Sequence, residues 1–138
     1  MTISAIRRGV RRNRTLTAAT TLTGLDSGKT IFIDNATGFA TTLPLPRAGM
    51  KFTFINKTAN TSGNHTIVTA SSANIIAGNQ NSVAGDAGDT STADDTISFV
   101  ANNSLAGDKV ELTTDGVTWF AFVVSRVAAG VTFTQASA

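Results

Sequence analysis

The chain has 138 residues with one histidine, one tryptophan and no cysteine or tyrosine, and only 14% of its residues are charged. This length favours a single domain, and the absence of cysteine excludes a disulfide scaffold, a thiolate zinc site and a cysteine nucleophile. No apolar run approaches the roughly 18 residues of a membrane-spanning helix, and residues 1–14 contain no apolar stretch long enough for a secretory signal.

The basic residues are concentrated at the start of the chain. Five of the eleven lie in residues 1–14, which leaves six against all nine acidic residues, so residues 15–138 carry a net charge of −3. A segment of this kind is typical of a tail that docks on an acidic surface. We therefore expect a basic N-terminal docking arm, residues 1–14, followed by a single β domain, residues 15–138. The five arginines are Arg7, Arg8, Arg11, Arg12 and Arg14.

The arm also carries a short apolar stripe, formed by Ile3, Ile6 and Val10. A helix of this length is marginal alone in water, so we expect the arm to become ordered on contact with a partner. It has no aromatic residues between its arginines on which nucleic-acid bases could stack. A protein partner therefore fits the arm at least as well as nucleic acid does.

The rest of the chain predicts short β-strands. Their residues are rich in threonine and other β-branched side chains, and turn residues recur between them about every 8 to 12 residues. This pattern is typical of an all-β fold, and we expect a compact, jelly-roll-like β-sandwich or β-barrel of short antiparallel strands. The predicted strands are 15–23, 29–35, 39–43, 50–56, 65–69, 74–77, 95–101, 109–113, 117–125 and 131–134.

Two polar loops are expected, at residues 57–64 and 78–94. The second contains or adjoins Asp86, Asp89, Asp94 and Asp95, and carboxylates of this kind are ligands for Ca²⁺. Their spacing does not match a calcium-binding loop, so we interpret them as a solvated turn cluster and expect no metal. The sequence does not decide whether this loop binds an ion.

Catalytic motifs are absent from the sequence. His65 is the only imidazole, and no nucleophile elbow accompanies it. No glycine-rich phosphate-binding motif is present, and Glu111 and Asp115 lack a convincing sugar platform. We therefore expect a binding or structural protein with no cofactor, and a hydrolase is the class of function that the sequence favours least.

Two strands carry large apolar side chains on both of their faces, in residues 31–33 and 119–122. A simple two-layer core buries only one face of each strand. The other face then needs a second buried surface, which a second copy of the chain can supply. The candidate subunit-interface residues are Ile31, Phe32, Ile33, Trp119, Phe120 and Phe122.

The order of several motifs resembles small virion proteins of tailed bacteriophages. These motifs are LDSGKTIFID at 25–34, TTLPLPRAGMKFTFIN at 41–56, GDKVEL at 107–112 and DGVTWFAF at 115–122. Within that group, the chain is similar to capsid decoration (cement) proteins and to the knob domains of head or tail fibres. The resemblance covers roughly residues 15–125 and rests on turns and strands, with no catalytic signature.

The resemblance implies a homotrimer on the capsid exterior of the virion that bridges and stabilises neighbouring subunits of the major capsid protein. No coiled coil or repeat precedes the β domain, which favours decoration over a fibre. The arm residues Ile3, Ile6, Arg7, Arg8, Val10, Arg11, Arg12 and Arg14 are then the candidate capsid contacts, and Pro44 to Gly49 would add more. Two further functions remain open, a fibre knob that binds host glycans through the two polar loops and a nucleic-acid binder that uses the arm. We expect no membrane partner.

Overall fold

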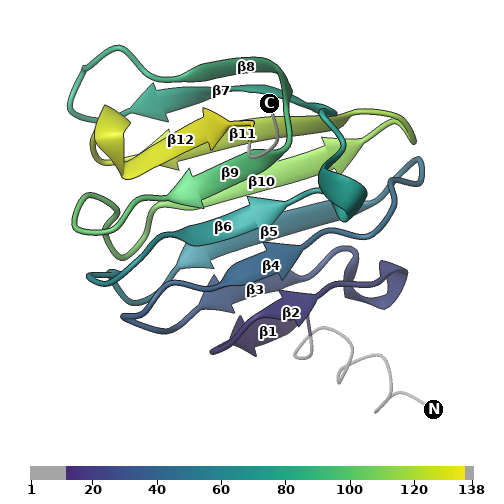
Figure 1. Ribbon diagram of the computed structural model, residues 1–138, viewed down its shortest axis with the longest axis horizontal. Coiled ribbons are helices and arrows are strands. Elements are labelled where there is room, and N and C mark those ends of the chain that lie inside the picture. Colours follow the sequence, from purple (N-terminus) through teal and green to yellow (C-terminus); the bar gives the residue numbers. More distant parts are fainter. Residues whose placement is uncertain (1–11, 136–138) are drawn as a thin grey trace.

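Two β-sheets, packed face to face, make up the part of the chain that the structure describes, residues 12–135 (Figure 1). In this computed structural model the larger sheet has seven strands, in the order β1 (Asn13–Leu16), β3 (Thr30–Ile33), β5 (Lys51–Asn56), β10 (Lys109–Thr114), β11 (Trp119–Ser125), β7 (Ile76–Ser82) and β8 (Thr90–Asp94). The smaller sheet has five, in the order β12 (Val131–Thr134), β9 (Thr96–Phe99), β6 (His65–Val68), β4 (Ala40–Thr42) and β2 (Thr20–Thr21). The prediction of an all-β sandwich is confirmed.

The sheets are mixed, whereas the sequence analysis expected antiparallel strands. Each of the first six strands lies in the sheet opposite to that of its predecessor (Figure 1). The chain therefore runs through each sheet repeatedly in the same direction, and β1, β3 and β5 are parallel to one another, as are β2, β4 and β6. Hairpins join β7 to β8 and β10 to β11, which pair antiparallel.

The core lies between the sheets and follows the alternation of the strands. In β5, Phe52 and Phe54 point inward, and Lys51 and Thr53 point outward. Trp119 packs against Phe52 with its ring centroid 5.7 Å away and is the largest fully buried side chain. A strand that alternates in this way can bury one face and leave the other for solvent or for a partner.

The polar segment 78–94 is largely strand, although the sequence analysis expected a loop. Strands β7 and β8 occupy most of it, and the connection between them is 83–89. A Cβ at Gly78 would lie 2.2 Å from the carbonyl oxygen of Ala121, so glycine lets β7 approach β11 closely. The buried Gln80 amide donates to Ser125 Oγ and to the Ala128 carbonyl and accepts the Asp89 N–H. Because these hydrogen bonds satisfy a polar side chain on the inward face of β7, the strand lacks the alternation of apolar and polar residues by which a strand is recognised in a sequence.

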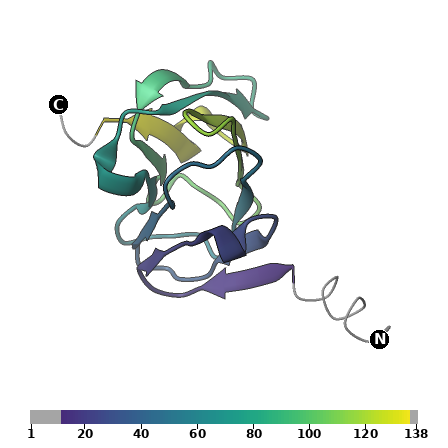
Figure 2. The ribbon, with the colours of Figure 1, turned by 90° about the vertical axis from the view of Figure 1, so that its right-hand side faces the viewer.

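The sandwich has two ends that differ in what they display. One end, which we call the η1 end, consists of residues 23–29 with the 3₁₀ turn η1 (Gly24–Asp26), residues 43–51, and the β10–β11 turn at 114–118. The described chain begins at Arg12 at this same end, because the Arg12 carbonyl accepts the Thr30 N–H beside η1. Figure 2 looks onto it. The opposite end carries 57–64, 83–89 and η3 (Ala128–Gly130), while η2 (Ala70–Ser72) follows β6.

Candidate interaction surfaces

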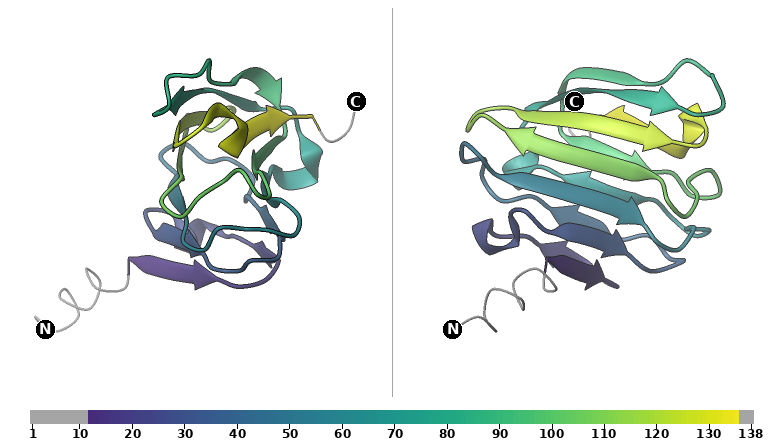
Figure 3. Two further views of the ribbon diagram at one scale, coloured as in Figure 1. Left: turned by 90° about the vertical axis from the view of Figure 1, so that its left-hand side faces the viewer. Right: turned by 180° about the vertical axis from the view of Figure 1, so that it is seen from behind.

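Two phenylalanines of β11 are exposed in the seven-stranded sheet. The strand alternates, so that Trp119 and Ala121 enter the core while Phe120 and Phe122 face outward with 48% and 51% of their surface exposed. Strands β10 and β7 flank β11 on its two sides, so β11 lies away from the edges of the sheet (Figure 3). Contiguous apolar patches on the surface of a soluble protein often mark an interaction site.

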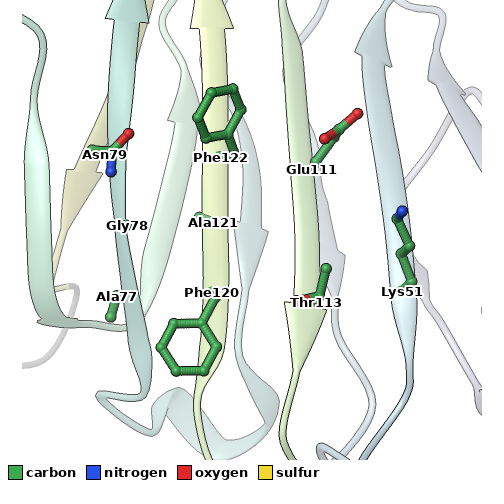
Figure 4. Close-up of a pocket in the computed structure, with 9 residues that line it drawn as sticks. All are labelled: Lys51, Ala77, Gly78, Asn79, Glu111, Thr113, Phe120, Ala121 and Phe122. Atoms are coloured by element: carbon green, nitrogen blue, oxygen red, sulfur yellow. The ribbon is translucent and has the colours of Figure 1, made fainter.

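A shallow hollow of about 430 Å³ lies on this outer face (Figure 4). The small residues Ala77 and Gly78 of β7 form one side of it, and the two phenylalanine rings stand beside them. The polar groups of Lys51 and Glu111 lie on the other side, two and one strands away from β11. The hollow is open, and its lining combines the two rings with the charged groups of Lys51 and Glu111.

Further apolar side chains continue the outer face along the strands. The strand register aligns Val124 with Lys109, Lys109 with Ile55, and Ile55 with Phe32 in one row across four strands. Ile55, Phe32 and Val124 are each partly exposed. We call the set Phe32, Ile55, Phe120, Phe122 and Val124 the outer apolar face.

The six candidate interface residues thus divide into two groups. Phe32, Phe120 and Phe122 lie on the outer apolar face. Ile31, Ile33 and Trp119 are fully buried in the core, so the expectation that they contact a second subunit is corrected: they cannot touch a second copy. The six residues divide in this way because successive side chains of β3 and β11 point to opposite faces of the sheet. The sequence shows this alternation, but it does not determine which face of each strand points into the core.

Most of the docking arm lies outside the described residues. Ile3, Ile6, Arg7, Arg8, Val10 and Arg11 belong to this part. Arg12 and Arg14 are described, and Arg14 is part of β1. Its guanidinium donates to both carboxylate oxygens of Asp26 at 3.0 Å. Arg14 therefore fastens β1 to η1, and the β domain includes the last residues that the sequence analysis assigned to the arm.

Asp26 is the electrostatic centre of this attachment. Its carboxylate also accepts the Thr23 N–H at 3.1 Å and pairs with Lys29 at 3.3 Å. Burial alone would raise the pKa of Asp26, but the hydrogen bonds from Thr23, Arg14 and Lys29 outweigh it and hold the pKa below its usual value. The reciprocal bonds between Thr23 and Asp26 form a capping box that fixes η1.

Two backbone groups hold the ring of His65 in the fold. Its Nδ1 accepts the Phe39 N–H at 3.3 Å, so Nε2 carries the proton and donates to the Asn35 carbonyl at 2.7 Å. Burial lowers the pKa of His65, although the bond to Asn35 works against this shift. Both hydrogen-bond partners are backbone groups, and neither is a nucleophile.

Two of the aspartates near 78–95 are hydrogen-bonded within the fold. Asp89 accepts the N–H groups of Thr90 and Phe133 at 2.9 and 2.8 Å, and Asp95 accepts the Thr96 hydroxyl at 2.7 Å. Within residues 12–135, no group of three or more histidine, cysteine or acidic side chains is placed to hold a metal ion. No helix in that same range is long and apolar enough to span a bilayer.

Three exposed apolar residues lie at the η1 end. Leu45 falls within Pro44 to Gly49, which the sequence analysis named as a further capsid contact, whereas Leu25 and Val117 were not singled out. Leu25, Leu45 and Val117 are 89%, 71% and 69% exposed. Leucine and valine in short turns give no periodic signal, so only the structure reveals their exposure.

Comparison with known proteins found no match to this chain among protein-family models, curated proteins or solved structures.

Proposed function

We propose that this chain is a non-enzymatic capsid decoration protein of a tailed bacteriophage. In this proposal, several copies associate through the outer apolar face, as a trimer, and the resulting oligomer binds the outside of the capsid. The basic arm and the η1 end would contact the major capsid protein and bridge neighbouring subunits. The virion exterior is then the place where the protein acts.

The observation that carries the proposal is the pair Phe120 and Phe122, half exposed in the interior of a seven-stranded sheet. A second copy is the occupant that we assign to this face. In a trimer, one part of this face would meet a different part of the same face on the next copy. Lys51 and Glu111 beside the rings give the face charges of both signs for such a contact. The resemblance to decoration proteins supplies the identity of the larger partner.

The fibre-knob hypothesis depended on two polar loops for glycan binding. One of them, 78–94, forms most of β7 and β8. The other, 57–64, is held by the buried side chain of Asn60, which donates to the carbonyls of Gly63 and Phe99. Decoration therefore has the better support.

Co-sedimentation with undecorated capsid shells tests the proposal. We expect the full chain to sediment with shells assembled from the major capsid protein encoded with it, and to raise the temperature at which the shells rupture. A variant that lacks residues 1–11 is the informative truncation, because it keeps Arg14 and β1. It should retain the wild-type oligomeric mass and lose shell binding.

Two results would contradict decoration. The first is a full chain that stays in the supernatant, and the second is a truncated variant that binds the shells as well as the full chain does. A selective hit of the full chain on a glycan array, together with no shell binding, would favour the fibre knob.

A further inference from the structure

The charges of the β domain are separated along the strands. The η1 end together with residues 12–14, which begin beside it, contains five basic residues and two acidic ones, a net charge of +3. The rest of residues 12–138 contains three basic residues and seven acidic ones, a net charge of −4. Arg7, Arg8 and Arg11 precede Arg12 in sequence and lie outside the described residues.

The cations at this end are only partly neutralised. Arg14 and Lys29 are paired with Asp26. Arg12, Arg47 and Lys51 take part in none of the ion pairs found among residues 12–135. The carboxylate of Asp115, the second acidic residue here, accepts the N–H groups of Val117 and Thr118. Arg12 and Arg47 are thus available for a partner at this end, whereas Lys51 lies on the outer face of β5 and lines the hollow beside Phe120.

Leu25 and Leu45 stand beside the same depression in this end. A hollow of about 650 Å³ is lined by Leu25, Arg47 and Met50, and an adjoining one of about 320 Å³ by Leu45 together with the same Arg47 and Met50. Gly24 lines both hollows, and a Cβ added there would lie 3.3 Å from the Met50 methyl group. The two leucines therefore flank one continuous depression with Arg47 in its wall.

Val117 extends the apolar surface across the β10–β11 turn. The turn packs on the 43–50 segment, because a Cβ at Gly116 would lie 3.2 Å from the Ala48 nitrogen and the Gly49 N–H donates to the Thr114 carbonyl. None of Leu25, Leu45 and Val117 contributes to the core. All three side chains are therefore free to contact a partner.

We infer that the η1 end is the surface by which the β domain docks on an acidic protein surface that also offers apolar side chains. Leu25, Leu45 and Val117 would bury against those side chains, while Arg12 and Arg47 would meet the carboxylates. The basic arm leaves the domain at this end. Eleven residues span at most about 40 Å when fully extended, so the arm would engage the partner within that distance of Arg12.

This inference rests on the proposed function, which identifies the acidic surface with the capsid shell. Nucleic acid is the occupant that charge alone would also allow. The exposed leucines and valine favour protein, because phosphate contacts do not need them and the residues of this end include no aromatic side chain for base stacking.

The test measures binding of full-chain variants to the same capsid shells. The apolar variant combines Leu25→Ser, Leu45→Ser and Val117→Ser, and its matched control is Val83→Ser, a side chain 74% exposed at the opposite end. The charge variant is Arg47→Glu, and its control is Arg126→Glu, which is also exposed and lies at the opposite end. Every variant must keep the wild-type oligomeric mass and thermal unfolding midpoint.

We expect the apolar variant and Arg47→Glu each to bind the shells at least about tenfold more weakly, and both controls to bind as the wild type does. Wild-type binding by the apolar variant, or equal losses in the variants and their controls, would overturn the inference and leave decoration standing. Absence of shell binding by the wild type would overturn decoration and this inference together. If duplex DNA displaced the wild type from the shells and the apolar variant bound the shells as well as the wild type does, the η1 end would be a nucleic-acid surface. That result would overturn protein docking.

Discussion

The carboxylate of Asp108 accepts the backbone N–H of Arg126 at 3.0 Å and so ties the turn before β10 to the residue that follows β11. The other carboxylate oxygen accepts the Ser104 hydroxyl and the Leu105 N–H, each at 3.0 Å. Ser104 in turn accepts the Asn56 amide at 2.9 Å. One buried carboxylate thus connects segments that lie far apart in the sequence.

Replacing this carboxylate should destabilise the fold. Asp108→Ala leaves two backbone N–H groups and a hydroxyl without their acceptor in a buried place, and we expect the free energy of unfolding to fall by about 2–4 kcal/mol. Asp86→Ala is the control, because Asp86 is exposed, and it should change that free energy by less than about 0.5 kcal/mol. Urea unfolding measures both, and equal effects would contradict the role of Asp108.

Acidification should weaken the fold through His65. Burial lowers the pKa of His65 in the folded state below its ordinary value of 6.5, so the unfolded chain takes up the proton first as the pH falls. Above about pH 6.5, His65 is neutral in both the folded and the unfolded chain, so it does not reduce the free energy of unfolding. Below that pH the free energy of unfolding should decrease as the pH falls. Urea unfolding from pH 8 to pH 5 measures the slope.

His65→Gln provides the comparison for this slope. Glutamine carries no titrating group, so the variant should be less stable than the wild type at pH 8 and should lose less of its stability between pH 6.5 and pH 5. The interpretation is wrong if both proteins lose stability equally over that interval.

The outer apolar face should hold the oligomer together. Phe120→Thr combined with Phe122→Thr keeps β-forming residues on β11 while it removes both rings, so the protomer should stay folded. Light scattering should then give a mass near the 14.2 kDa of one chain, against a multiple of it for the wild type and for Val83→Thr. A double variant with the wild-type mass, or a monomeric wild type, would rule out this interface.

The close approach of β7 to β11 should tolerate no side chain at Gly78. A methyl group there would collide with the Ala121 carbonyl oxygen at 2.2 Å, and the backbone of a strand can give way only by weakening its ladder. We expect Gly78→Ala to reduce the free energy of unfolding by about 1–3 kcal/mol. Ala77→Ser, at the neighbouring and partly exposed position, should be nearly neutral, and similar losses in both variants would refute the steric explanation.

The sequence predicted the fold class because alternation in β5 and β11 reports directly on burial. It could not predict strand pairing. Residues 30–33 would carry the same side chains if β3 paired with β4 through a hairpin, instead of pairing with β5 in the same sheet after the chain has crossed to the other sheet and back. Strand β7 was missed for a different reason. Its inward residue Gln80 is polar, and its partners Ser125 and Asp89 come from distant parts of the chain.

The candidate surfaces were predictable in part. Apolar residues on both faces of β3 and β11 indicated a surface outside the core, and Phe32, Phe120 and Phe122 occupy it. Which face was inward depended on the sheet that each strand joined, so Ile31, Ile33 and Trp119 were assigned to the wrong side. Leu25, Leu45 and Val117 lie in turns, where exposure depends on three segments meeting at one end of the sandwich.

The crossing of the first six strands between the sheets has a consequence for folding kinetics. None of these strands pairs with its neighbour in sequence, so every ladder among them requires closure of a long loop, as between Asn13 and Thr30 or between Thr30 and Thr53. Refolding measured by stopped flow should accordingly take milliseconds to seconds, slow for a chain of this size. The β10–β11 hairpin, whose closure is local, is the natural place for the first ordered contacts, and the winding of β1 to β6 should be the step that limits the rate.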